Sequence, residues 1–482
     1  MPRKILGEGG YGCVHKPSLH CMTPPASNFD YSKYVSKLMK TKNANEELRE
    51  FVTIHTHDPN NEYHLGTPIL CKPDVNDATF IKDAKKCKRI YPKLQQKPDQ
   101  ISLLVLKYGG PDLKQFCMDN MTNFLKTNKQ QKSDKFWLEV HHLIKGLKFF
   151  RDNGIVHNDL KPQNILYDMK KNKLTFIDFG LMKPKPEIVK LSKQNKNPMA
   201  NFHWSFPIEC GFMSYNEYSK YKRSIARRAL AKNELIGMIV AGDTKNTANL
   251  DIPRPEAFEL FFTYINSSSP PADMSSTYKY VFYDSAFDGL YKIINLDYSE
   301  YLEKIIDSID VYGLGFTLQY ILNCFKRHNG IAEDFFIKCS ALFAQMFEPD
   351  ITERVLDIKV LLDDYEDILL ETGLLARMNK SFEDNILVNR APMPSPIMRL
   401  AEKEERSTES VKPLSSHLER IADMDPVPKK LSKICPPEKE LNPATNRCVK
   451  RCEPGQTRNA KFRCKKNKTK KSNSKTRSNS KI

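Results

Sequence analysis

The chain has 482 residues, with 76 Lys and Arg against 58 Asp and Glu, and this length predicts two or three folded units rather than one compact core. No stretch approaches about 18 consecutive apolar residues and the N-terminus has no apolar segment long enough for a signal sequence, so we expect a soluble, intracellular protein without a transmembrane segment. Residues 429–482 hold 18 Lys and Arg against three Glu, which predicts a near-neutral body followed by a basic tail.

Residues 1–110 predict a small β-rich lobe. The runs at 34–39 and 101–108 have the composition of strands, and residues 43–55 have the apolar spacing of a helix. Residues 111–374 predict a larger helical lobe, because long helical patterns dominate there. The expected fold class is therefore α+β, with two lobes.

The segment GEGGYGCV, residues 7–14, has the spacing G-x-G-x-x-G-x-V. In that pattern glycines let the backbone of a β-turn approach phosphate groups that side chains would block, and Val14 would face an adenine ring. Gly-rich turns without a ligand are also common, and that interpretation stays open for this segment taken alone. The candidate nucleotide-binding residues here are Gly7, Glu8, Gly9, Gly10, Tyr11, Gly12, Cys13 and Val14.

A lysine on the next predicted strand is the second candidate. Alternation along YVSKLM puts Val35 and Lys37 on one face, so that an apolar surface lies beside an ammonium group that could hold phosphates. Lys33 and Lys40 are alternatives for this role, and a solvated side chain is the ordinary state of any single lysine.

The helix predicted at 43–55 offers this ammonium group a carboxylate partner. Glu47 lies beside the apolar stripe of the helix, so we expect its side chain to turn inward. A Lys–Glu pair between strand and helix would fix the ammonium at the phosphates. Glu46 and Glu50 are the alternatives on this helix.

The stretch HNDLKPQN, residues 157–164, contains a carboxylate, a lysine and an amide in Asp159, Lys161 and Asn164, and FIDFG adds Asp178 nineteen residues after the first carboxylate. Phosphoryl transfer requires a carboxylate that accepts a hydroxyl proton, oxygen ligands for Mg²⁺ and a lysine that offsets phosphate charge. An Asx-rich turn would account for part of this set but not for all of it.

These motifs occur in the order of the protein kinase signature set, and the chain resembles protein kinases over about residues 5–370. Three later segments continue the resemblance: SFPIE with Glu209, DVYGLG with Asp310 at the start of a long central helix, and EPDITER with Arg354, which would pair with Glu209. The resemblance implies a bilobal protein kinase fold and a phosphotransferase that uses ATP and Mg²⁺.

The resemblance also implies a role for each polar candidate. Asp159 would be the catalytic base and Lys161 would neutralise the γ-phosphate. Asn164 and Asp178 would bind the metal. The pair of Lys37 with Glu47 would anchor the nucleotide.

By the same resemblance, LVLKYGG looks like the hinge between the lobes. Backbone groups of Leu106, Lys107 and Tyr108 would then bind adenine, and Asp112 would approach the ribose. The lysine of DLKPQN, Lys161, resembles that of serine/threonine kinases, so the expected substrates are Ser or Thr hydroxyls of proteins.

One departure from the family concerns regulation. The family's H-R-D reads HND at 157–159, and a neutral Asn158 removes a buried positive charge that a phosphorylated activation loop would neutralise. Residues 181–206 contain no Thr or Tyr and only two serines, Ser192 and Ser205. We therefore predict activity without phosphorylation of this segment, so that phosphatase-treated protein keeps its rate.

A second departure is the length between Glu209 and Asp310, where the family usually has a short connection. We place an insertion at about 211–305, beside the peptide-binding face, where it would shape substrate choice. A surface subdomain without that role is the alternative. The connection from Cys71 to Gln100 is also longer and richer in Lys than usual.

Twelve cysteines divide into eight in the body and four in the tail. The body cysteines show no paired spacing, so we expect reduced and mostly buried thiols. They are Cys13, Cys21, Cys71, Cys87, Cys117, Cys210, Cys324 and Cys339.

Residues 375–434 are polar, Pro-punctuated and poor in aromatics, and they predict a linker. Residues 435–464 hold two copies of one pattern: Cys, Pro at +2, Asn at +7, then Arg-Cys-x-Lys. The pattern resembles two-cysteine adaptor modules in proteins of large DNA viruses, including kinases of the iridovirus-like group, which implies a viral origin. We expect two Cys-bracketed hairpins, with a four-Cys zinc site as the alternative.

Residues 465–482 are basic and of low complexity, and they predict a disordered tail. A solvated end is one interpretation, and attraction to nucleic acid, an acidic protein or a membrane surface is the other. The tail has no aromatic residues to stack on bases. We expect a monomer that acts in the host cytoplasm or the virion if the protein is viral.

Two functions are consistent with these patterns. The first is an ATP- and Mg²⁺-dependent serine/threonine protein kinase. The second is a pseudokinase scaffold that keeps the fold while the repeats and tail bind partners. Every catalytic position of the family set holds a competent residue, which favours the first. A small-molecule kinase of the same fold is disfavoured by SFPIE and Arg354.

Overall fold

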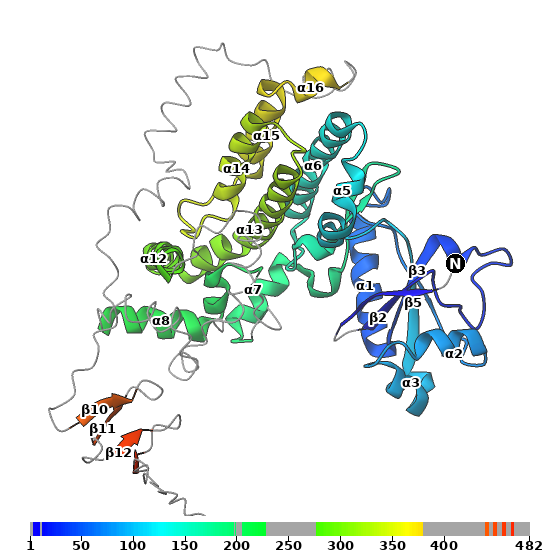
Figure 1. Ribbon diagram of the computed structural model, residues 1–482, viewed down its shortest axis with the longest axis horizontal. Helices are drawn as coiled ribbons and strands as arrows, with labels where there is room; N and C mark the ends of the chain where they lie inside the picture. Colours follow the sequence, from blue (N-terminus) through cyan, green and yellow to red (C-terminus); the bar gives the residue numbers. More distant parts are fainter. Residues whose placement is uncertain are drawn as a thin grey trace, which may run out of the picture. The chain divides into compact units, whose positions relative to one another are not determined.

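The computed structural model describes residues 3–9, 12–196, 198, 205–227 and 276–378, together with four short strands between residues 439 and 466. The chain divides into two compact units, Met1–Ile421 and Ala422–Ile482. The first unit contains a sheet-rich N-terminal lobe and a helical lobe, as the sequence predicts (Figure 1).

The N-terminal lobe is built on a five-stranded antiparallel sheet with the strand order β1-β2-β3-β5-β4. The strands are β1 (Lys4–Glu8), β2 (Gly12–Lys16), β3 (Tyr34–Lys40), β4 (Ile69–Cys71) and β5 (Ile101–Lys107). The helices of this lobe are η1 (Tyr31–Lys33), α1 (Thr41–His57), α2 (Ala78–Ala84), α3 (Tyr91–Gln96) and η2 (Pro98–Gln100).

Helices cover the two faces of this sheet, with α1 on one side and α2 and α3 on the other (Figure 1). Successive side chains of a strand point to opposite faces. Met39 and Leu104 accordingly pack with Ala44 of α1, whereas Leu38 packs with Phe80 of α2. The long connection after β4 therefore forms a second layer over the sheet.

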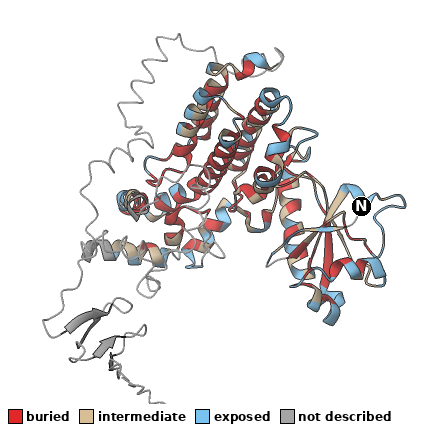
Figure 2. Ribbon diagram, in the orientation of Figure 1, coloured by how far each residue is buried: buried red, intermediate tan, exposed pale blue. Residues whose placement is uncertain are grey.

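The helical lobe is organised around α13 (Tyr298–Arg327), which is buried along most of its length (Figure 2). Its N-cap is Asp297, whose carboxylate accepts a hydrogen bond from the amide of Ser299 at 2.9 Å. The prediction that Asp310 marks the start of this helix is therefore wrong. Residues 298–305 belong to α13 and not to the predicted insertion.

The other large helices pack around α13 and share one apolar core with it. This part of the lobe contains α4 (Leu113–Gln115), the π-helix η3 (Phe116–Asn120), α5 (Met121–Phe124), α6 (Lys129–Asp152), α14 (Glu333–Met346), α15 (Ile358–Glu371) and α16 (Leu374–Arg377). The guanidinium of Arg377 lies 2.9 Å from the Asp134 carboxylate of α6, so the predicted linker begins after α16 and not at residue 375. Residues 379–438 lie outside the described part of the chain.

Shorter elements between α6 and α13 carry the candidate site. They are β6 (Ile155–Val156), η4 (Pro162–Asn164), β7 (Ile165–Asp168), β8 (Lys173–Phe176), η5 (Phe179–Leu181), β9 (Lys183–Pro184), α7 (Lys185–Lys193), η6 (Ile208–Phe212), α8 (Tyr215–Arg227) and α12 (Ser276–Ile293). Strand β6 pairs with β9, and β7 pairs with β8. Of the predicted insertion, residues 228–275 fall outside the description.

The prediction of reduced cysteines is half right. Four are free and buried, namely Cys117, Cys210, Cys324 and Cys339. The other four form two disulfides, Cys13–Cys87 and Cys21–Cys71, so the expectation of reduced thiols is wrong for them. Sequence separations of 74 and 50 residues give no pairing signal, because tertiary folding brings each pair together. Cys87 lies in the connection between β4 and β5 and meets Cys13 of β2, whereas Cys71 ends β4 and meets Cys21.

The second unit contains two antiparallel hairpins. Strand β10 (Lys439–Asn442) pairs with β11 (Arg447–Lys450), and β12 (Gln456–Arg458) pairs with β13 (Cys464–Lys466). Each copy of the repeated pattern therefore contains one hairpin, while the likeness to adaptor modules stays a prediction. Residues 467–482 of the basic tail are outside the description. Among the helices that the structure describes, none has the length and apolar character needed to span a bilayer.

Candidate active site

The loop at 157–164 connects β6 to β7, and α13 holds it in place. Asp310 of α13 accepts hydrogen bonds from the backbone amides of His157 at 2.7 Å and Asn158 at 3.0 Å. Burial raises the pKa of Asp310 to about 6, against the opposing effect of these two hydrogen bonds. Nothing in the spacing of Asp310 within its helix indicates this contact. Its role in holding the 157–164 loop could therefore not be predicted from the sequence.

Asp159 is the buried carboxylate of this loop. Both of its carboxylate oxygens lie 2.7 Å from the Nζ of Lys161. The Nδ2 of Asn164 donates to Asp159 Oδ2 at 2.7 Å and to its main-chain oxygen at 2.8 Å. Burial raises the pKa of Asp159, and the Lys161 ammonium opposes that shift. The three polar residues singled out in the HNDLKPQN stretch therefore lie in contact.

Asp178 reaches the same region from the end of β8. The Ile177 amide donates to the main-chain oxygen of Asn164 at 2.9 Å, so Asn164 and Asp178 lie at the same end of the β7–β8 hairpin. Asp178 has a left-handed backbone with φ of 60°, and its side chain is 45% exposed. The Lys37 ammonium lowers the pKa of Asp178, which keeps this open carboxylate ionised.

Lys37 of β3 connects the two lobes. Its Nζ lies 2.7 Å from Glu47 Oε2 on α1 and 3.5 Å from Asp178 Oδ1. Burial would lower the pKa of Lys37, but the carboxylates of Asp178 and Glu47 outweigh burial and raise it. The strand–helix ion pair expected from the sequence is thus present in the structure, and Val35 lies two residues before it on the same strand.

The residues weighed as alternatives for this pair lie elsewhere. Lys33, Lys40 and Glu46 are exposed at the surface. Glu50 is half-buried on α1, one turn beyond Glu47. Burial, reinforced by the Glu47 carboxylate, raises the pKa of Glu50 to about 8.

Aromatic contacts join α1 to the 157–164 loop. Phe51 of α1 packs edge-on against Phe179 with 5.5 Å between ring centroids, and Phe179 packs against His157 at 5.0 Å. Complete burial lowers the pKa of His157 to about 4, so the ring is neutral at physiological pH. The helix that carries Glu47 is therefore coupled by packing to the segment that carries Asp159.

The Gly-rich segment connects β1 and β2. The strands pair Gly7 with Val14 and Glu8 with Cys13, and Val14 pairs in turn with Lys37 of β3. This register places the Gly-rich segment next to the strand that carries the candidate lysine.

The glycines of this segment differ in their surroundings. A Cβ added to Gly12 would lie 2.9 Å from the main-chain oxygen of Leu38, so a side chain has no room there. A Cβ added to Gly9 would meet no atom within 4 Å, as expected if its open side faces a ligand. Gly10 and Tyr11 lie outside the described residues.

The hinge prediction agrees with the structure only in part. Leu106 and Lys107 end β5, where they are in register with β3. The amide of Tyr108 donates to the main-chain oxygen of Lys33 at 3.1 Å, so this group is already paired within the protein, contrary to the expectation that it binds adenine. Asp112, expected near the ribose, caps α4 through its side chain.

Ion pairs anchor the segment that follows Asp178. The Nζ of Lys185 lies 2.8 Å from Asp307 and 3.1 Å from Glu303, both on α13. Glu209 and Arg354 form a fully buried ion pair, which is the contact expected from their motifs.

Residues 97–202 match the model of the family described as protein kinase domain. This part of the chain is therefore similar to protein kinase domains. The matched region includes the 157–164 loop and Asp178, which hold the polar cluster described above. The Gly-rich segment and Lys37 precede the matched region.

Similarity of the chain to curated proteins extends over short stretches. Cyclin-dependent kinase 17 of Caenorhabditis elegans is 36% identical over 87 residues, which make up 18% of this chain and 12% of that protein. A putative serine/threonine-protein kinase/receptor of Acanthamoeba polyphaga mimivirus is 46% identical over 68 residues, or 14% of this chain and 4% of that protein. Cyclin-dependent kinase B2-1 of Arabidopsis thaliana is 33% identical over 88 residues, or 18% of this chain and 27% of that protein.

The aligned stretches thus span only small parts of these relatives. Among solved structures, the kinase of Cydia pomonella granulovirus aligns with 38% of this chain and 55% of its own at 22% identity. The TM-score of 0.22 is too low for that alignment to carry a structural argument.

Proposed function

We propose that the chain is an ATP- and Mg²⁺-dependent serine/threonine protein kinase, which transfers the γ-phosphate of ATP to Ser or Thr hydroxyls of proteins. The observation that carries this proposal is the contact of Lys37 with both Glu47 and Asp178. It brings together a strand, a helix and a loop that are far apart in sequence, in the combination that positions phosphates and metal during phosphoryl transfer.

The residues present fit a magnesium ion. Asn164 and Asp178 offer amide and carboxylate oxygens, which are the hard ligands that Mg²⁺ prefers, and Asp178 is open to a ligand. When bound, the metal would neutralise phosphate charge. Lys37 would hold the phosphates, and the backbone of the Gly-rich segment would lie along them.

Asp159 is the proposed catalytic base. Burial raises its pKa and so makes it a better proton acceptor than a surface aspartate. Lys161 and Asn164 hold the carboxylate in one orientation. Lys161 would also offset the charge of the transferred phosphate, as the kinase resemblance implies.

We further propose that activity does not require phosphorylation of the segment after Asp178. The Nδ2 of Asn158 donates to the main-chain oxygen of Leu181 at 3.0 Å, so a neutral amide bonds this segment where the family has an arginine. Ser192 is completely buried and Ser205 is 2% exposed, which leaves neither hydroxyl accessible to another kinase.

A scaffold without catalysis is the second candidate function, and the hinge favours it. The Tyr108 amide is bonded to Lys33, and the Nζ of Lys16 lies 3.1 Å from the centre of the Tyr108 ring. The first contact occupies the Tyr108 amide, which is one of the backbone groups expected to bind adenine. A scaffold of this kind would bind nucleotide weakly or not at all.

The 46% identity to a stretch of a mimivirus protein supports the further proposal of a viral origin. Such a protein would act as a monomer in the host cytoplasm or in the virion. Its basic tail would bind an acidic protein or nucleic acid. If the tail binds DNA, affinity should fall steeply as salt rises, and an affinity independent of salt would contradict this partner.

The kinase proposal is tested by incubating the full chain with labelled ATP, Mg²⁺ and a basic protein substrate, beside Asp159→Asn under identical conditions. We expect phosphoserine or phosphothreonine from the wild type and a loss of at least about 10²-fold in the variant. Phosphatase treatment beforehand should leave the rate unchanged. Nucleotide binding without transfer by the wild type would favour the scaffold.

A further inference from the structure

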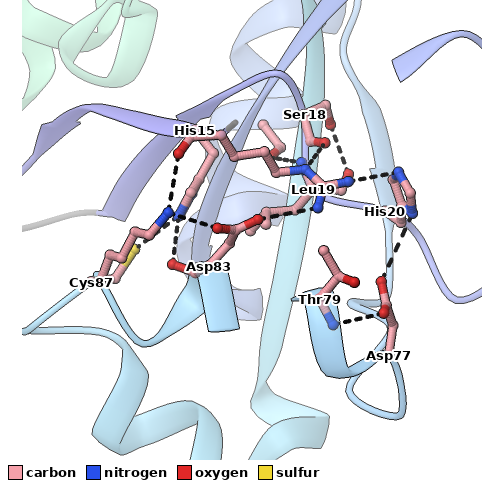
Figure 3. A network of polar contacts seen from close by, with 11 residues as sticks. His15, Ser18, Leu19, His20, Asp77, Thr79, Asp83 and Cys87 are labelled. Atoms are coloured by element: carbon pink, nitrogen blue, oxygen red, sulfur yellow. Dashed lines mark hydrogen bonds and ion pairs between the residues drawn. The ribbon is translucent and has the colours of Figure 1, made fainter. Parts of the chain in front are cut away.

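The face of the N-terminal sheet that α2 and α3 cover carries a cluster of metal-binding side chains. Figure 3 shows two of them, His15 and Cys87. Cys13 and His15 lie two residues apart on β2, so their side chains share this face, and Cys87 follows α2. One ligand atom of each lies within 4.8 Å of the other two. All three residues are completely buried. No other group of this kind occurs in the part of the chain that the structure describes.

A disulfide between the two cysteines does not by itself explain the histidine. His15 Nε2 lies 3.3 Å from the main-chain oxygen of Asp83 and 3.5 Å from Cys87 Sγ. His15 Nδ1 has no hydrogen-bond partner among the described residues. Burying an unpaired polar nitrogen costs free energy, and a disulfide gains little from an imidazole beside it.

The second disulfide of the lobe provides an internal comparison. Cys21 and Cys71 contact the same apolar cluster as Cys13 and Cys87, and their disulfide joins the end of β4 to the chain that follows β2. They form no three-residue ligand group with a nearby His, Asp or Glu within the described ranges. Cross-linking therefore needs no histidine, and the buried imidazole of the first pair indicates an additional role.

We propose that Cys13, His15 and Cys87 bind one Zn²⁺ ion when the cysteines are reduced, and that the disulfide is the oxidised, metal-free form of the same site. Thiolate and imidazole are the ligands that zinc prefers, and zinc sites are four-coordinate. The main-chain oxygen of Asp83, 3.3 Å from His15 Nε2, or a water molecule would complete the fourth position. This proposal does not depend on kinase activity.

Conversion of the zinc-bound form to the disulfide form requires a two-electron oxidant, and a small-molecule disulfide can serve as that oxidant. The two zinc-bound thiolates lose two electrons and form the S–S bond, the small disulfide accepts them and becomes two thiolates, and Zn²⁺ leaves. Glu8 accepts hydrogen bonds from the amides of Lys88 at 3.1 Å and Arg89 at 2.6 Å. Cys13 belongs to the Gly-rich hairpin and Cys87 follows α2, so the disulfide and the zinc site would each join these two segments, as the Glu8 hydrogen bonds already do.

The test uses the full chain with serine at the four tail cysteines, Cys435, Cys448, Cys452 and Cys464, so that the tail contributes no zinc binding. The protein is reduced with a phosphine, stripped of metal and titrated with Zn²⁺ against a chromophoric chelator. We expect one zinc ion per chain. In this background Cys13→Ser or Cys87→Ser should weaken binding by at least about tenfold, whereas Cys21→Ser with Cys71→Ser should leave it unchanged.

A second measurement guards against variants that fail to fold. Oxidised glutathione added to the zinc-loaded reference protein should release the metal, and renewed reduction should restore binding. Substitution by Co²⁺ should give a thiolate-to-metal charge-transfer band that is absent from the double variant with both Cys13→Ser and Cys87→Ser. The proposal is overturned if the reduced reference protein binds no zinc, if it keeps zinc when oxidised, or if the Cys13→Ser and Cys87→Ser variants bind as tightly as the reference.

Discussion

The two faces of the N-terminal sheet differ in the side chains that they carry. The face toward α1 carries Lys37, whose ammonium group meets the buried Glu47 and the half-exposed Asp178. The face toward α2 and α3 is mostly apolar apart from the buried His15, and it is cross-linked by disulfides. Adjacent residues of one strand, such as Cys13 and Val14, therefore belong to separate environments. The comparison teaches that the charged residues proposed to bind a ligand gather on one face, while apolar packing and disulfides gather on the other.

The largest effect is expected on the α1 face, from Asp178→Asn. Loss of a carboxylate proposed to hold Mg²⁺ at the reacting phosphates should lower kcat/KM for ATP by about 10²–10³-fold. Because the Asp178 side chain is 45% exposed and Asn has nearly the same volume, the melting temperature should hardly change. Steady-state kinetics and thermal unfolding check both parts. The matched control is Asp152→Asn, whose carboxylate is 57% exposed and should be silent in both assays.

The other face should respond in the opposite way. Phe80 is completely buried between α2 and the sheet, so Phe80→Ala should lower the free energy of unfolding by about 3–5 kcal/mol. Turnover per folded molecule should stay at the wild-type value. Urea unfolding and active-site titration separate the two quantities, with the exposed Met22→Ala as control. A fall in turnover of the folded fraction would mean that the faces are not independent.

Removing the Cys21–Cys71 disulfide, which has no neighbouring metal-ligand group within the described residues, should cause a smaller loss of stability. Replacing both Cys21 and Cys71 by serine should lower the free energy of unfolding of the oxidised protein by about 2–4 kcal/mol, since the bond constrains the unfolded chain. Urea unfolding before and after reduction provides the measurement. Equal stability of the variant and the oxidised wild type would show that this bond contributes nothing to the lobe.

The last prediction concerns Glu50, on the α1 face. Its pKa of about 8 in the folded protein exceeds the ordinary value of 4.5, so the folded state binds one more proton than the unfolded state between these values. The free energy of unfolding should therefore fall as pH rises from 4.5 toward 8. Glu50→Gln should remove the contribution of Glu50 to the pH dependence of the free energy of unfolding. Glu46→Gln, a substitution at an exposed residue, should leave that pH dependence unchanged. Identical slopes for all three proteins would contradict the burial argument.

The sequence predicted the α1 face far better than the other. Period-two alternation placed Lys37 on the correct face, and the amphipathic pattern of its helix selected Glu47 over two other glutamates. Both inferences depend on short-range periodicity, which a single sequence displays. The contact between Asp159 and Asn164 was also foreseeable, since the two are five residues apart in one loop.

Contacts between distant segments were not foreseeable in this way. The Cys13–Cys87 bond and the hydrogen bonds from Asp310 to His157 and Asn158 depend on tertiary folding, and neither leaves a spacing signal. The start of α13 was missed because the helical pattern continues well before Asp310. The paired amide of Tyr108 was missed for a similar reason, since its acceptor lies in a different segment.

Amide hydrogen exchange with and without Mg²⁺ and a non-hydrolysable ATP analogue tests most directly whether the α1 face alone holds the nucleotide. We predict slower exchange on binding in β3, in α1 and in the 157–164 loop, with no change in α3. Asp178→Asn should weaken this protection. Protection of α3 without protection of β3, or no protection anywhere at saturating nucleotide, would contradict the assignment of this face as the active site.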